Sequence, residues 1–102
     1  MKIIQLVVDK IEEEIGDARS YAKLALEHKD DHRSLAEVFF SLSNEELRHS
    51  TILHNEVVKL ISEYRQQHGE PPSEMMAVYD YLHKRSIERA EEVKRYQQLY
   101  QA

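Results

Sequence analysis

Residues 42–57 read LSNEELRHSTILHNEV and lie in the middle of a long stretch with helical periodicity. Apolar residues recur every three or four positions on both sides of this segment, as in an amphipathic helix. The apolar seam consists of Leu35, Val38 or Phe39, Leu42, Ile52 or Leu53, Val57 and Leu60. Where the seam should continue between Leu42 and Leu53, the sequence places Glu46 and His49. We therefore expect a long helix that directs a carboxylate and an imidazole toward the core.

The composition favours a small, entirely helical protein. The chain has 102 residues, of which 41% are hydrophobic and 32% charged, as expected for one soluble globular domain. It contains only two glycines and two prolines, which disfavours a fold with many strands and turns. We predict an all-α fold in which residues 1–102 form a single helical domain.

Charge and residue content argue against several classes of function. The net charge of −5 disfavours nucleic acid or an anionic membrane as a partner, because both require a basic surface. The absence of cysteine excludes a disulfide, a thiol nucleophile and a thiolate metal site. The apolar run near the N-terminus is too short for a signal-peptide core, and no stretch approaches a membrane span. We expect a cytoplasmic protein that binds neither nucleic acid nor membranes.

Two polar breaks divide the chain into three predicted helices. The expected helices cover about residues 3–28, 34–67 and 73–100. In the first break, Asp31 or Ser34 can cap the second helix, and Ser34 with Glu37 would make a capping box. In the second break, Gly69 can adopt a left-handed conformation, and the two prolines that follow cannot continue a helix.

The first and third helices each carry a stripe of residues that we expect to face inward. In the first helix the stripe is Ile4, Val7, Ile11, Ile15, Ala18, Ala22 and Ala25. In the third helix it is Tyr79, Leu82, Ser86, Ala90, Val93, Gln97 and Tyr100. Gly16 lies in the middle of the first helix, where glycine is unfavourable. It either permits close approach of another helix or is simply tolerated.

The helix register brings three polar residues to one level. Short connections make neighbouring helices antiparallel. If the first turn is centred near residue 31, Glu14 lies 31 − 14 = 17 residues before it and faces position 31 + 17 = 48. That position falls between Glu46 and His49, so we expect all three side chains at the same height and facing inward.

These residue types suit a metal ion. A Glu and a His at positions i and i+3 project from one face of a helix, and a Glu from the facing helix adds a further oxygen. Carboxylate and imidazole ligands without thiolate suit iron, manganese or zinc. Coordination would also offset the cost of placing charges in a core. Glu14, Glu46 and His49 are therefore the candidate metal ligands.

The segments EEEIGDARSYAKLAL (12–26) and LAEVFFSLSNEELRHS (35–50) resemble the first helical pair of the ferritin-like superfamily, especially rubrerythrin-like proteins. The family's Glu-x-x-His motif falls on Glu46 and His49, and its first-helix Glu falls on Glu14, with Asp17 as an alternative. The resemblance covers about residues 10–60. It implies a ferritin-like antiparallel hairpin, a non-haem di-iron or di-manganese site, and a ferroxidase-type oxidation of Fe(II) by O2 or peroxide.

The third helix does not supply the second half of such a site. The family has a second helical pair with another Glu and another Glu-x-x-His. At the matching level, residues 91–94, Glu91 and Glu92 are present, but the inward stripe holds Ala90 and Val93. We therefore expect two chains to complete the bundle, each bringing a half-site, as the similarly short encapsulated ferritins do. The first helix, apolar nearly all round at its start, also favours a homodimer or larger homo-oligomer.

Simpler interpretations remain open for each of these residues. Glu46 and His49 would then be boundary residues that reach solvent or pair with Arg48 or Lys23. Asp80 and His83 repeat the Glu-x-x-His spacing, but they map to the height of residues 57–60, where a solvated helix face is expected.

The other histidines and the function as a whole also have a simpler interpretation. His28 and His32 are expected on the surface of the first turn, and His54 and Glu56 are second-choice ligands. The corresponding functional alternative is a metal-free helical interaction module that retains the ferritin-like hairpin, with the third helix in place of the missing pair.

Overall fold

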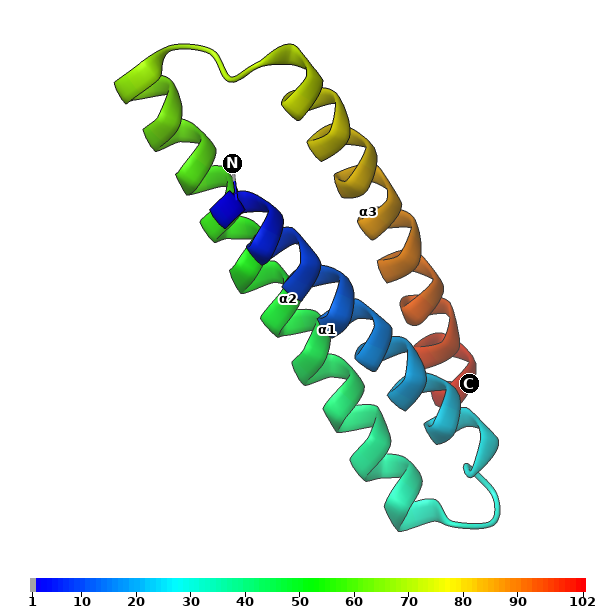
Figure 1. The fold of residues 1–102 in the computed structure, drawn as a ribbon. Coiled ribbons are helices and arrows are strands. Elements are labelled where there is room, and N and C mark those ends of the chain that lie inside the picture. The colour runs from blue at the N-terminus through cyan, green and yellow to red at the C-terminus, as the bar shows by residue number, and fades with distance from the viewer. Residues whose placement is uncertain (1) are drawn as a thin grey trace.

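The computed structural model describes residues 2–102, and this part of the chain consists of three α-helices without a strand (Figure 1). α1 spans Lys2–Glu27, α2 spans Arg33–His68 and α3 spans Ser73–Gln101. The prediction of an all-α fold is confirmed, and each helix bound differs from the expected one by one residue at most. The molecule is a rod with extents of 55 × 18 × 18 Å.

α1 packs against both other helices. α2 runs antiparallel to α1, and α3 turns back to run in the same direction as α1 (Figure 1). α2 has 36 residues and α1 has 26, so the start of α1 lies part-way along α2. The level of Glu14 and Glu46 therefore falls in the middle of the rod, where all three helices are present.

The core follows a seven-residue repeat. The buried residues of α1 alternate between spacings of four and three: Ile4, Val8, Ile11, Ile15, Ala18, Ala22 and Ala25. Val8 takes the place that we expected for Val7, which is half-buried. In α2 the buried residues are Ala36, Ser43, Ser50, Val57 and Ile61, and in α3 they are Val93 and Gln97. This spacing is typical of helices packed as in a coiled coil.

The seam predicted for α2 is wrong in part. Leu35, Val38 and Ile52 are 47%, 51% and 49% exposed, whereas the buried stripe of α2 begins with Ala36, Ser43 and Ser50. The physical reason is size, because small side chains on the buried stripes let α1 and α2 approach closely, as the 2.8 Å hydrogen bond from Ser43 Oγ to the carbonyl of Ala18 shows. The larger apolar residues of α2 consequently lie further round the helix.

The two turns differ in how well their caps were predicted. α2 begins after His32, which makes no side-chain cap hydrogen bond, so the expected caps at Asp31 and Ser34 and the capping box do not form. The Asp31 carboxylate instead contacts the ring of His28, with Oδ1 3.1 Å from Nδ1. Gly69 ends α2 and donates its N–H to the carbonyl of Arg65. Its φ of 78° is positive, as expected, but its ψ of −160° lies outside the left-handed helical region that we predicted.

Candidate metal centre

Glu14 of α1 meets Glu46 and His49 of α2, as the register predicted. Each residue offers one ligand atom, and the three atoms all lie within 4.8 Å of one another. His49 Nδ1 is 3.7 Å from Glu14 Oε2 and 3.9 Å from Glu46 Oε2. A tetrahedral ion with ligands at about 2.0–2.2 Å would hold such atoms roughly 3.4 Å apart. Small side-chain movements would therefore bring all three onto one cation.

The cluster lies at the edge of the α1–α2 interface rather than in the core. The side chains of Glu14, Glu46 and His49 are 28%, 19% and 41% exposed. The expectation that they point into the core is therefore wrong, because Ser43 and Ser50 occupy the buried stripe of α2 at this level. This position makes the cluster accessible to an ion from solvent and to a second chain.

One carboxylate oxygen in the cluster lacks a hydrogen-bond partner. Glu46 Oε2 is buried and accepts no hydrogen bond. The imidazole Nδ1 of His49 lies 3.9 Å away, which is beyond hydrogen-bond distance. A buried carboxylate oxygen without a partner is costly. A bound cation would supply the missing partner, so the donor set and its surroundings fit a divalent metal.

The rival ligands and partners from the sequence do not join this cluster. Asp17 is exposed and lies outside the group of ligand atoms, so the geometry favours Glu14 as the residue from α1. Within residues 2–102, the ion pairs of Glu46 and of His49 are those inside the cluster, and neither involves Arg48 or Lys23.

α3 contributes no ligand atom to the cluster in the part of the chain described here. Glu91 is exposed, and Glu92 is engaged by Arg19 of α1, whose Nε donates to Glu92 Oε1 at 2.7 Å. The hydrogen bond from Arg19 holds the pKa of the Glu92 carboxyl below its usual value. The guanidinium also lies 5.7 Å from the centre of the Tyr96 ring. Glu92 therefore ties α3 to α1 and is not available to the metal cluster.

The sequence did not predict a second feature, a half-buried histidine pair that joins α2 and α3. The rings of His54 and His83 are stacked with centroids 4.6 Å apart and planes 11° apart, and the Tyr79 ring is stacked with that of His83 at 5.8 Å. The expected solvated face at His83 is therefore wrong, although Asp80 is exposed. Both histidines occupy positions of the seven-residue repeat, and that was the available signal.

The histidine pair lines a mainly apolar cavity of about 170 Å³, which includes Val8, Ile11 and Ile15 of α1. Burial lowers the pKa of His54, and the nearby His83 lowers it further. Stacked rings present their faces to each other, so their nitrogens are not directed at a common ion. The pair is therefore a packing feature, and its surroundings favour the neutral form of His54.

Comparison with known proteins identifies no matching family model, no matching curated protein and no matching solved structure. The resemblance to ferritin-like proteins stays a prediction from the sequence. Between residues 2 and 102, none of the three helices combines the length and the apolar character that crossing a membrane would require.

Proposed function

We propose that this chain is a ferritin-like, non-haem metal protein whose ligands are Glu14, Glu46 and His49. The observation that carries the proposal is the convergence of these three side chains around a buried carboxylate oxygen that has no hydrogen-bond partner. Two carboxylates and one imidazole suit iron or manganese best, and zinc is also compatible. A bound iron pair would supply the redox chemistry by which Fe(II) is oxidised with O2 or peroxide.

We further propose that the metal site is shared between two copies of the chain. Three protein ligands are fewer than a di-iron carboxylate site in one helical bundle uses, so one chain provides half of the set. The outer face of α2 supports this arrangement. Leu35, Val38 and Ile52 are about half exposed. Ile52 follows His49 by three residues, and Val38 and Leu35 precede it by 11 and 14, so all three lie on the His49 side of the helix. An apolar stripe beside the ligands favours a second chain as its cover.

The start of α1 gives independent support for association. Ile3 and Leu6 are 48% and 53% exposed, although Ile4 and Val8 beside them are buried in the bundle. A helix end that is apolar on both its faces requires cover on both sides, and the three-helix rod covers one. A homodimer or larger homo-oligomer would supply the other.

Metal content of protein purified without chelator tests the proposal. We expect about one iron or manganese ion per chain, which is two ions for two half-sites. Glu46→Ala and His49→Ala should each abolish tight binding, because each removes a ligand. His83→Ala is the matched control, since it removes a half-buried histidine that lies outside the cluster.

Two outcomes would contradict the proposal. Equal metal content in the wild type, Glu46→Ala and His49→Ala would exclude the cluster as the site and favour the metal-free interaction module. A strictly monomeric protein that binds two ions per chain, both lost in Glu46→Ala, would exclude the shared site while leaving a metal function in place.

A further inference from the structure

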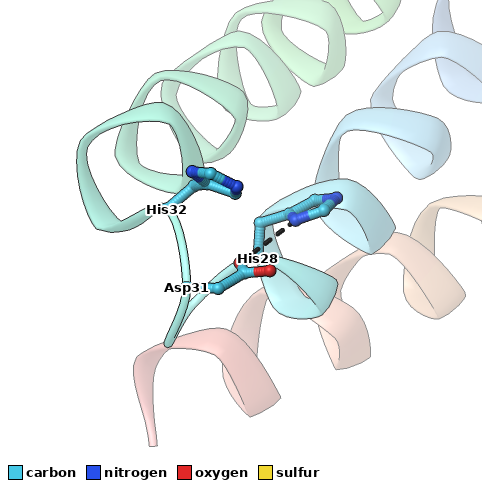
Figure 2. Close-up of side chains that lie close together, drawn as sticks. All are labelled: His28, Asp31 and His32. Atoms are coloured by element: carbon cyan, nitrogen blue, oxygen red, sulfur yellow. Dashed lines mark hydrogen bonds and ion pairs between the residues drawn. The ribbon is translucent and has the colours of Figure 1, made fainter.

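The turn between α1 and α2 holds a second group of metal-ligating side chains, about 14 residues along α1 from Glu14. His28, Asp31 and His32 each offer one ligand atom, and these atoms lie within 4.8 Å of one another. Figure 2 shows the ring of His28 beside the carboxylate of Asp31, with the ring of His32 on the same side of the turn. The two ring centroids are 5.7 Å apart.

The backbone of the turn holds these residues in place. His28 donates its N–H to the carbonyl of Leu24 at 3.1 Å, and His32 donates its N–H to the carbonyl of His28 at 3.0 Å. The two histidines are therefore separated by one helical turn, the i and i+4 spacing at which side chains are neighbours. The arrangement is local, and it does not require the packing of the bundle core.

The neighbouring lysine does not compete for this group. Lys29 donates from Nζ to the main-chain oxygen of Ala102 at 2.6 Å and lies 6.0 Å from the centre of the Tyr100 ring. Its charge is thus directed toward the end of α3. The Asp31 carboxylate is paired only with a histidine ring among the ion pairs of residues 2–102.

We infer that His28, Asp31 and His32 form a second, solvent-accessible site for a divalent cation of the zinc type. Two imidazoles and one carboxylate are the three protein ligands of many zinc sites, with the remaining position taken by water. Ligand atoms in such a site are roughly 3.4 Å apart, so side chains at the surface of the turn need to close by little more than an ångström. Bound zinc would fasten the end of α1 to the start of α2. This inference is independent of the function proposed above.

Calorimetric titration with Zn²⁺ tests this site on the full chain after metal removal. The background is the double variant Glu46→Ala, His49→Ala, so that the cluster in the middle of the rod cannot bind zinc. We expect this protein to bind one Zn²⁺ per chain. Adding His28→Ala or His32→Ala should weaken binding by about tenfold or more, because even the loss of an outer partner of a ligand costs roughly 10–100-fold.

His68→Ala on the same background is the matched control. His68 is an exposed histidine near the other end of α2 and belongs to neither cluster, so its loss should leave zinc affinity unchanged. Imidazole resonances in NMR spectra provide a second measurement, in which Zn²⁺ should shift those of His28 and His32 and leave that of His68 in place.

Three results would overturn the inference. The first is that the background protein binds no zinc. The second is that His28→Ala and His32→Ala leave its zinc affinity unchanged. The third is that His68→Ala lowers zinc affinity as much as those two substitutions do. A failure of Glu14, Glu46 and His49 to bind iron would leave this test unaffected, because the background protein already lacks two of these three ligands.

Discussion

Gln97 of α3 donates from Nε2 to Ser43 Oγ of α2 at 2.9 Å, and Ser43 Oγ in turn donates to the carbonyl of Ala18 of α1 at 2.8 Å. Ser43 is fully buried and Gln97 is 8% exposed. This chain of two hydrogen bonds joins all three helices at one level. Because buried polar groups are costly without partners, it fixes the register of the bundle more strictly than apolar packing does.

Ser43→Ala tests that chain. The substitution leaves the Gln97 amide without its acceptor in a buried place, so we expect unfolding free energy to fall by about 1–3 kcal/mol. Ser41→Ala is the matched control, because Ser41 is exposed on the same helix and reports the gain in helix propensity alone. Urea unfolding of the three proteins gives the comparison. Equal effects of the two substitutions would show that the hydrogen bonds contribute nothing to stability.

Gly16→Ala should stabilise the protein by about 1 kcal/mol, the usual penalty of glycine inside a helix. A Cβ at this position would have Nη2 of Arg89 as its neighbour at 3.7 Å, an ordinary contact with a flexible side chain. Gly16 is therefore tolerated and not required for close approach of a helix.

Gly69→Ala is the contrasting variant. The φ of 78° at Gly69 disfavours any side chain although the space is open, so alanine there should destabilise by about 1–3 kcal/mol. Thermal melts of both variants distinguish the two glycines. A stabilising Gly69→Ala would mean that α2 ends differently.

Glu46→Leu should raise the stability of the metal-free protein by about 1–3 kcal/mol, because it removes a buried carboxylate oxygen that accepts no hydrogen bond. Glu45→Leu, at an exposed neighbouring position, controls for the general effect of leucine in the helix. Added Mn²⁺ should stabilise the wild type by about 2.7 kcal/mol at a hundredfold excess over Kd, and should leave Glu46→Leu unchanged. The same response in both proteins would exclude Glu46 as a ligand.

Ile52→Lys should weaken self-association. Ile52 is 49% exposed on the stripe of α2 that contains His49, and a lysine there would place a charge in the proposed contact between two chains. Leu99→Lys is the control, since Leu99 is 57% exposed on α3 and lies away from the cluster. Light scattering at micromolar concentration measures the mass of both. Dissociation by Leu99→Lys alone would place the contact on α3.

Acidification should destabilise the protein through His54. Burial, reinforced by His83, lowers the pKa of His54 in the folded state below the ordinary value of 6.5. The folded state therefore binds fewer protons than the unfolded state, so stability is complete above pH 6.5 and declines as pH falls through the lowered pKa. His54→Phe keeps an aromatic ring against His83 and removes the charge. Its melting temperature should fall less than that of the wild type between pH 7.5 and 5.

A matched substitution separates this effect from the other histidines. His68→Phe alters an exposed residue and should retain the full pH dependence of the wild type. If His54→Phe and the wild type lost stability in parallel, the pair of His54 and His83 would have no part in the acid response.

The sequence predicted the register of the bundle better than its buried surface. Short turns leave little freedom in how antiparallel helices align, and so Glu14 could be matched to Glu46 and His49 by counting residues. The sequence did not predict that α2 buries Ala36, Ser43 and Ser50, because small and polar residues carry little signal in a hydrophobic pattern. Their burial depends on close approach by α1, which is a property of two helices together.

The unpredicted stack of His54 on His83 has a similar origin. Each residue alone is a polar side chain on a long helix, and the contact requires that the register of both turns be known at once. Asp31 was expected to cap α2. Its carboxylate instead contacts the ring of His28, three residues earlier, which competes with the cap as a partner. Local sequence rules therefore predicted the helices, while interactions across turns and interfaces decided the details.

The uneven distribution of small residues has a consequence for motion. Ala18, Ala22 and Ala25 hold α1 against the serine and alanine stripe of α2, whereas α3 buries only Val93 and Gln97, both near its C-terminal end. Detachment of the first half of α3 would separate His83 from His54 but would uncover no fully buried residue of α3, so it should be the lowest-energy opening of the fold. Such an opening would leave the α1–α2 hairpin closed, so Glu14, Glu46 and His49 would keep their mutual positions while the third helix exchanges its amide hydrogens with solvent.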